Sequence, residues 1–159
     1  MNSPTLLRIS GLVDRPLELG FADLASLSAE YQIRDVSQID PKRKGGAIRF
    51  AGLLALCGPQ ANARFLGLHS ARDDFHASIP IEAVRDRAIV IYELDQASLP
   101  ISAGGPVRFF IPDHAQCRTH EIDECANVKF VDHMELTADR GFDNRPHDEQ
   151  SHADLHAKE

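Results

Sequence analysis

The segment from Asp113 to Cys125, DHAQCRTHEIDEC, places two cysteines and two histidines in one short polar stretch. The four residues are spaced His114-x2-Cys117-x2-His120-x4-Cys125. Imidazole nitrogen and thiolate sulfur are the ligands of tetrahedral zinc sites, although paired zinc ligands more often close a Cys-x2-Cys knuckle. A disulfide or redox pair between the two cysteines and a solvated loop with free thiols are the alternatives. The segment thus predicts, as one of three interpretations, a metal site made of His114, Cys117, His120 and Cys125.

A second group of chemically active side chains lies in the stretch PKRKGG, where Lys42, Arg43 and Lys44 precede two glycines. Glycine lets backbone amides approach an anion while the cations neutralise it, so the stretch could cradle a phosphate. The alternative, which this composition favours, is a charge run in a solvated loop. Arg108, the cation in the apolar stretch VRFFIP, presents the same choice between binding an anion and facing solvent.

Several histidines also occur where they could act together. His69, Ser70 and His76 come from neighbouring predicted strands, and a Ser–His pair can serve as nucleophile and base. The sequence around Ser70 has no glycine elbow and no assignable orienting acid, so polar residues lining a cleft are the simpler interpretation. In the C-terminal tail, His152 and His156 are four residues apart and could bind a divalent metal weakly with His147. A disordered, solubilising tail is the favoured alternative there.

Length and charge limit the function classes. The chain has 159 residues, which suits a single domain, and its net charge of −7 argues against a general nucleic-acid-binding role. No apolar run approaches the roughly twenty residues that a membrane helix needs. The N-terminus lacks the pattern of a signal peptide, so we expect a cytoplasmic protein. Three cysteines, an odd number, favour free thiols or metal ligands over a disulfide framework.

The elements that must position these residues are mostly strands. Alternating apolar residues predict strands in LRISGLV, ARFLGLHSA, DFHASIPI and VRFFIP, and RAIVIYEL is apolar on both faces, as in a central, doubly covered strand. NVKFVDHMEL predicts a strand with Val128, Phe130, Met134 and Leu136 on one face. Helices are expected over FADLASLSAEY and over IRFAGLLALC, the second ended by Gly58. We therefore predict one α+β domain, a mixed β-sheet with short helices, over residues 1–137, and a charged, mobile tail over 138–159.

The order of these segments resembles the sulfite oxidase-like oxidoreductase molybdopterin-binding domain family. RISGLVDRPLEL is similar to the family's opening I-x-G-x-V-x-x-P-L-x-L pattern, and RFAGLLAL to its W-x-G-V-x-L segment, with Phe50 in place of the tryptophan. DDFHASIPIEAV is similar to D-G-Y-x-x-S-I-P. LPISAGGPVRFFIP and NVKFVDHMEL match two further family segments, so the resemblance runs in order from Leu7 to Leu136.

This resemblance implies a mixed α+β fold around a molybdenum–pterin cofactor (molybdopterin), with a cysteine thiolate on the metal and cations on the pterin phosphate. Arg108 and Lys129 match positions beside the cofactor. The loop that should supply the cysteine, Tyr31 to Gly46, contains none, and the equivalent positions hold Val36 or Ser37. A serine hydroxyl is a hard ligand that does not simply replace a soft thiolate. The candidate cofactor-binding residues are Arg108, Lys129, Ser37, Lys42, Arg43 and Lys44.

Two functions follow from this departure. The first is a molybdopterin-dependent oxidoreductase domain; the second is a non-catalytic descendant that binds another small anionic molecule or a protein partner. A structural zinc in the 114–125 segment is compatible with either function. Cys57 falls in the predicted helix that follows the loop and is not a candidate ligand.

Overall fold

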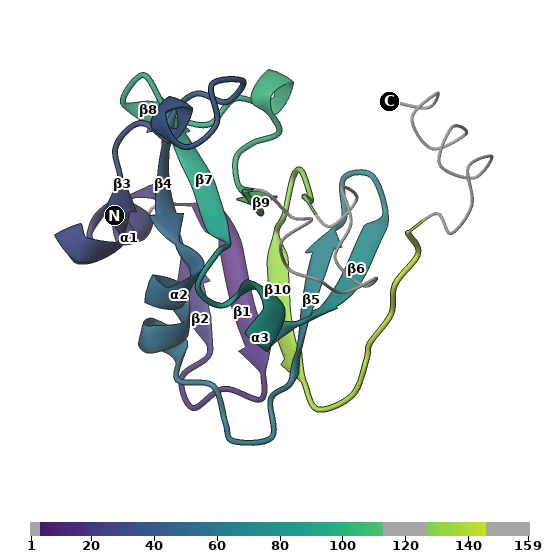
Figure 1. The fold of residues 1–159 in the computed structure, drawn as a ribbon. Helices are drawn as coiled ribbons and strands as arrows, with labels where there is room; N and C mark the ends of the chain where they lie inside the picture. The colour runs from purple at the N-terminus through teal and green to yellow at the C-terminus, as the bar shows by residue number, and fades with distance from the viewer. Residues whose placement is uncertain (1–3, 113–126, 146–159) are drawn as a thin grey trace.

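The computed structural model describes residues 4–112 and 127–145, which form two β-sheets and short helices (Figure 1). The first sheet has the strand order β2-β1-β10-β5-β6, and only β1 and β10 run parallel in it. Its strands are β1 (Leu7–Gly11), β2 (Leu17–Leu19), β5 (Phe65–Ser70), β6 (Phe75–Pro80) and β10 (His133–Thr137). One face of each strand is apolar, as alternation predicts, and the other carries polar residues.

The second sheet is built around β7 (Ile89–Leu94), the strand predicted to be covered on both faces. This prediction is confirmed, because Val90 and Tyr92 pack into the main core while Ile89 and Ile91 pack into a smaller apolar cluster on the opposite face. The other strands are β3 (Gln32–Ile33), β4 (Gly46–Arg49), β8 (Ala97–Ser98) and β9 (Arg108–Phe110). Their order is β3-β4-β7-β8, and β9 pairs with β7.

The two predicted helices are both shorter than expected. Ile48 and Arg49, the expected start of the second helix, belong to β4. Helix α2 (Phe50–Cys57) ends at Gly58, whose φ of 67° suits glycine. The helix expected over residues 21–31 is wrong in length, since α1 covers only Phe21–Ala25. Gln32 Nε2 donates to the carbonyls of Leu24 (3.0 Å) and Leu27 (3.2 Å) and so satisfies groups that a longer helix would have used.

The remaining helical segments are single turns. They are α3 (Ile81–Val84) and the 3-10 turns η1 (Ala29–Tyr31), η2 (Val36–Gln38) and η3 (Ile101–Ala103). The predicted α+β class, with strands dominating, is therefore confirmed. In the described part of the chain, no helix is long and apolar enough to cross a membrane.

The main core lies between the two sheets and is closed by α2. Phe109 of β9 and Phe50 of α2 meet edge-to-face, with ring centroids 5.7 Å apart, and both are essentially inaccessible to solvent. The outer face of the second sheet carries the smaller cluster, which includes Val36 from the segment between β3 and β4. This segment, residues 34–45, therefore packs onto the second sheet and brings its polar side chains there.

The prediction of one continuous strand over residues 127–136 is wrong at its beginning. β10 begins only at His133, and Val128 and Val131 are both buried, which strict alternation forbids. The cause is Phe130, whose φ of 56° interrupts the extended backbone. The amides of Phe130 and Val131 donate instead to the carbonyls of Gly104 and Val107.

The expected start of a mobile tail after Thr137 also differs from the structure. Residues 141–145 run beside the edge strand β6 (Figure 1) and supply the hydrogen-bond partners that a neighbouring strand would provide. The amides of His76 and Ser78 donate to the side chains of Asn144 (2.8 Å) and Asp143 (2.9 Å). Arg145 is only 4% exposed, so the packed domain continues at least to this residue.

Candidate functional site

A polar groove of about 420 Å³ lies where the 34–45 segment meets the end of β7. Ser37 and Lys44, two of the predicted cofactor-binding residues, line it together with Arg34 and Gly45. The opposite wall is formed by residues 93–96. Sequence reasoning missed this wall, because Glu93 near the end of β7 and Asp95 in the turn after it belong to no recognisable motif.

Local hydrogen bonds determine how Ser37 is presented. Asp35 caps η2, and its Oδ1 accepts from the backbone amide of Ser37 at 3.0 Å and from the Ser37 hydroxyl at 2.5 Å. The Ser37 hydroxyl therefore already donates to a carboxylate. The charges of the groove are mixed, because Arg34 and Lys44 face the carboxylates of Asp35, Glu93 and Asp95. Such a surface gives an anion little net attraction.

A second group of cations lies on the outer face of the second sheet. Arg108 and Phe110 share this face of β9, and the Arg43 guanidinium sits over the Phe110 ring at 4.8 Å from its centroid. Lys129 approaches Arg108 at Gly104, since a Cβ added to that glycine would lie 3.0 Å from Arg108 Cδ and 3.2 Å from Lys129 Cγ. We call Arg43, Arg108 and Lys129 the cation cluster.

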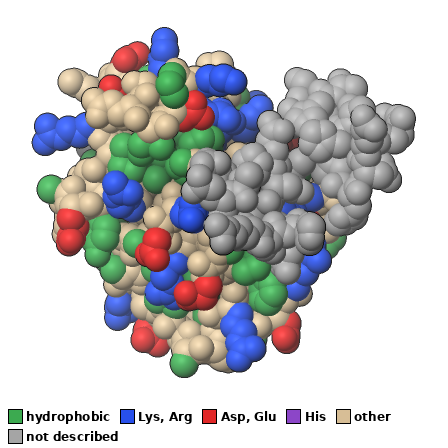
Figure 2. Space-filling view, in the orientation of Figure 1, with side chains coloured by type: hydrophobic (Ala, Val, Ile, Leu, Met, Phe, Trp, Pro, Cys, Tyr) green, Lys and Arg blue, Asp and Glu red, His purple; other side chains and the backbone are tan. Residues whose placement is uncertain are grey.

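The side chains of Arg108 and Lys129 therefore occupy the space beside Gly104 that a Cβ would need. Gly104 has a φ of 95°, which favours glycine, and Arg108 Nη1 donates to the carbonyl of Ala103 at 3.2 Å. On the face shown in Figure 2, Lys and Arg side chains border an area of hydrophobic surface in the upper half of the molecule. Cations beside apolar surface are suited to a ligand with both an anionic group and a flat ring.

The structure thus divides the six predicted cofactor-binding residues. Ser37 and Lys44 line the groove, whereas Arg43, Arg108 and Lys129 belong to the cation cluster. Lys42 is in neither group; its backbone amide donates to Asp40 Oδ1 at 2.9 Å, which forms the turn before Arg43. The lysine and arginine run is therefore spread over different surfaces and does not form a single phosphate cradle.

The sulfur chemistry of the described residues is limited to Cys57. Its side chain is buried in the main core, and its Sγ donates to the carbonyl of Leu54 within α2 at 3.8 Å. Burial raises the pKa of the Cys57 thiol, which disfavours the thiolate. Cys57 therefore does not face the groove or act as a metal ligand in this fold.

The predicted metal site, His114, Cys117, His120 and Cys125, lies outside the described residues, as do His147, His152 and His156 of the tail. Neither the structure nor the comparisons below support zinc. Within residues 4–112 and 127–145, no three His, Cys, Asp or Glu side chains are grouped so that they could hold a metal ion.

The first sheet carries a polar face that the sequence predicted only in part. His69 and His76, which were expected to meet, are cross-strand partners in β5 and β6, with their Nδ1 atoms 2.8 Å apart. Ser70 is fully buried and points to the opposite, apolar face, because side chains alternate along β5. A nucleophilic pair of Ser70 with His69 or His76 is therefore excluded, since Ser70 cannot reach either ring.

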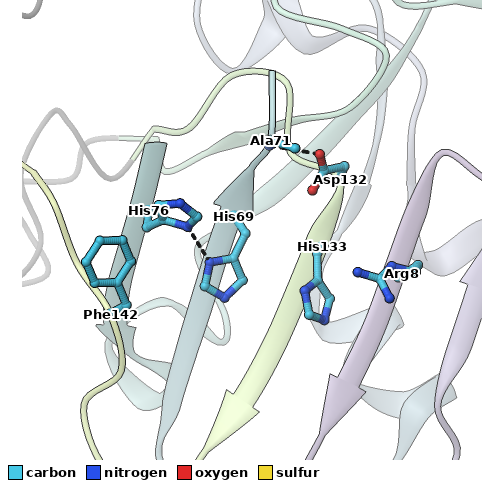
Figure 3. Close-up of a pocket in the computed structure, with 7 residues that line it drawn as sticks. All are labelled: Arg8, His69, Ala71, His76, Asp132, His133 and Phe142. Carbon is cyan, nitrogen blue, oxygen red and sulfur yellow. Dashed lines mark hydrogen bonds between the residues drawn. The ribbon is translucent and has the colours of Figure 1, made fainter. Parts of the chain in front are cut away.

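Further residues join the two histidines in an open pocket of about 350 Å³ (Figure 3). Its lining is Arg8, His69, Ala71, His76, Asp132, His133 and Phe142. Sequence reasoning missed His133 and Arg8 here. Alternation does place them on polar faces, but only the strand order β1-β10-β5 brings them beside His69.

The protonation of His133 follows from its surroundings. Burial lowers its pKa, and the positive charge of Arg8, its cross-strand partner, lowers it further. His133 Nε2 lies 2.6 Å from Ser10 Oγ, so the ring is held by a hydroxyl on β1 and not by a carboxylate. We therefore treat His133 as a neutral neighbour of the His69–His76 pair.

The sequence and the fold were compared with those of known proteins and protein families. The family model for the oxidoreductase molybdopterin binding domain matches residues 45–142. No curated protein matches the chain. The crystal structure of the sulfane dehydrogenase SoxCD from Paracoccus pantotrophus is similar, with a TM-score of 0.61 and 19% sequence identity over 84% of this chain. That alignment spans 38% of the SoxCD chain, and at this identity it shows a shared fold.

The family match covers more than half of the chain, and it includes both Arg108 and Lys129. The similar structure supports the same conclusion for the arrangement of the two sheets. The chain therefore belongs to the oxidoreductase molybdopterin-binding domain family, with a sulfite oxidase-like α+β fold.

Proposed function

We propose that this domain binds a small phosphate-bearing molecule at the cation cluster and does not carry out molybdenum redox chemistry. The observation that supports the proposal is the close approach of Arg108 and Lys129 around Gly104, with Arg43 stacked on Phe110 along the same strand face. Three cations close together on one surface can bind an anionic group through charged hydrogen bonds.

The family implies molybdopterin, and the residues of this chain fit that cofactor only in part. The cation cluster suits the pterin phosphate, because guanidinium groups bind phosphate oxygens through paired hydrogen bonds. Among the described residues, the metal half has no thiolate ligand. Residues 31–46 contain no cysteine, Asp35 is engaged in capping η2, and Cys57 is buried in the core. A soft thiolate is thus missing where the family uses one.

A phosphate-binding domain without molybdenum therefore fits these residues better than an oxidoreductase does. The ligand would be a small molecule with a phosphate group, either a pterin without its metal or another phosphorylated compound. A protein partner with a phosphorylated side chain would be recognised by the same chemistry. We propose the small molecule, because the 34–45 segment that carries Arg43 also lines the polar groove, which suits a compact ligand.

The test compares two single arginine substitutions. Arg108→Gln removes a charge from the cation cluster, whereas Arg34→Gln removes one from the groove and serves as the matched control. With pyrophosphate as the probe, we expect Arg108→Gln to weaken binding by about tenfold or more, the effect of losing one or two charged hydrogen bonds. Arg34→Gln should change binding by less than about threefold. Isothermal titration calorimetry at low salt measures both.

The opposite ranking would contradict the proposal and place the anion in the groove. Thermal unfolding of each variant controls for folding. If wild-type protein binds neither pyrophosphate nor a pterin phosphate, the proposed function is wrong as a whole.

A further inference from the structure

The facing histidines on the first sheet form an unusual contact. His69 and His76 are a directly opposed pair on β5 and β6, and they lie on the polar face of the sheet, away from the core. Their side chains are 17% and 20% exposed, so both rings are largely shielded from solvent. Their Nδ1 atoms are 2.8 Å apart (Figure 3).

A carboxylate holds the other nitrogen of each ring. His69 Nε2 lies 3.2 Å from Glu135 Oε1 on β10, and His76 Nε2 lies 3.0 Å from Asp74 Oδ1 in the turn between β5 and β6. Gly67 contributes to this arrangement, because a Cβ there would lie 2.9 Å from His69 Nε2. The position opposite Glu135 is thereby kept free for the His69 ring.

These contacts fix where the protons lie. An ionised carboxylate only accepts hydrogen bonds, so each Nε2 carries the proton and each Nδ1 of a neutral ring carries a lone pair. Two lone pairs at 2.8 Å repel one another unless a positive centre lies between them. That centre is a proton or a metal cation. Orientation of a histidine by a carboxylate on its far nitrogen is also the usual arrangement around metal-ligating histidines.

We propose that His69 and His76 bind a divalent transition-metal ion of the copper or nickel type through their two Nδ1 atoms. The separation of the nitrogens, which is also that of a hydrogen bond between the rings, is compatible with this class of ion. Two ligands at right angles, each about 2.0 Å from a metal, lie about 2.8 Å apart, whereas a tetrahedral ion requires about 3.3 Å. Square-planar or tetragonal coordination by nitrogen and oxygen is the preference of Cu²⁺ and Ni²⁺.

Water from the open pocket supplies the other ligands. The described residues offer no third side chain in position, and His133 is turned toward Ser10 Oγ. The surrounding charge favours a cation, because Asp74, Glu135 and Asp132 outnumber Arg8 around the histidine pair. The Phe142 ring lies against His76, with centroids 4.8 Å apart, and covers one side of the pair.

The site lies on the first sheet, whereas the cation cluster lies on the outer face of the second. The metal proposal is therefore independent of the proposed phosphate-binding function.

The experiment measures Ni²⁺ bound per full-length chain near neutral pH, by equilibrium dialysis and by calorimetry. Ni²⁺ is the probe because Cu²⁺ oxidises thiols, and the chain has three cysteines. His69→Gln and His76→Gln should each bind one Ni²⁺ fewer than wild type, or bind it about tenfold more weakly. His133→Gln is the matched control, a neighbouring histidine on the same face, and should bind as wild type does.

Because the chain has eight histidines, other sites can also bind Ni²⁺. The site is therefore tested by the difference in bound Ni²⁺ between wild type and each variant. Equal Ni²⁺ content in wild type, His69→Gln and His76→Gln would overturn the proposal, as would wild type that binds none. A second measurement on wild type covers the case of a variant that does not fold. Ni²⁺ should broaden the imidazole NMR signals of His69 and His76 before those of His133, and the reverse order would also refute the site.

Discussion

Replacing Arg145 by methionine is expected to lower the free energy of unfolding by about 3–5 kcal/mol at neutral pH, because it leaves a buried carboxylate without its cation. Arg145 and Asp143 are each 4% exposed, and the Arg145 Nη2 atom lies 2.7 Å from Asp143 Oδ2. Arg145 Nε completes the pair at 3.0 Å from Asp143 Oδ1. Denaturation in urea measures the change. Methionine keeps most of the apolar stem of arginine, so the loss reports the charge.

The matched control is Arg140→Met. Arg140 Nη2 also approaches Asp143 Oδ2, at 3.4 Å, but its side chain is 47% exposed. Solvent-exposed ion pairs contribute roughly 0–1 kcal/mol, so this variant should remain close to wild type. Equal losses of unfolding free energy in the two variants would contradict the conclusion that a buried ion pair holds residues 141–145 against β6.

The pH dependence provides a second readout for this pair. Burial alone would raise the pKa of Asp143, but hydrogen bonds from the Arg145 guanidinium and from the amides of Ser78 and Arg145 outweigh it and lower the pKa to about 2. A carboxyl whose pKa falls on folding stabilises the protein above its unfolded pKa. The contribution, about 2 kcal/mol, should therefore be present at neutral pH and decline as the pH falls from about 4 toward 2. In Arg145→Met this acid-dependent loss should be much smaller.

Phe109→Ala is expected to lower the free energy of unfolding by about 3–5 kcal/mol, the usual cost of removing a buried aromatic ring. Phe109 has no exposed surface and lies at the centre of the main core, against Phe50. Its loss would leave a cavity between β9 and α2 that neither element can close. Arg108 and Phe110, its neighbours on β9, face the opposite side, so the effect on the cation cluster should be indirect.

Ile101→Ala is the control for this substitution. Ile101 is 52% exposed, and surface substitutions of this kind usually change stability by less than about 0.5 kcal/mol. Urea denaturation should give clearly different free energies of unfolding for the two variants. If Phe109→Ala behaved like Ile101→Ala, the assignment of β9 to the core would be wrong.

The sequence could predict those elements in which apolar residues recur regularly or a glycine marks the end. The apolar run of β7 indicated a strand covered on both faces, and Gly58 indicated the end of α2; both are confirmed. The failures come from side chains that act over longer distances. Gln32 ends the first helix from outside it, and the left-handed backbone of Phe130 interrupts an alternating pattern that looked continuous.

The candidate site shows the same limit. The family resemblance selected Arg108 and Lys129. It could not reveal that Arg43 stacks on Phe110, whereas the backbone amide of Lys42 donates to Asp40 in a turn. His69 and His76 could be paired from the sequence because they belong to adjacent strands. Glu135 reaches His69 only because β10, more than sixty residues later, pairs with β5. Asp143 and Arg145 were missed because a charged stretch with almost no large apolar residues indicated disorder.

We propose that this member of the molybdopterin-binding family carries no molybdenum on a protein thiolate. The most direct test is elemental analysis for molybdenum, zinc and iron, together with a fluorescence assay for released pterin, on full-length protein from a host that makes the cofactor. We expect less than about one molybdenum per ten chains, with or without pterin. About one molybdenum per chain, together with stoichiometric pterin, would contradict the claim and restore the oxidoreductase interpretation.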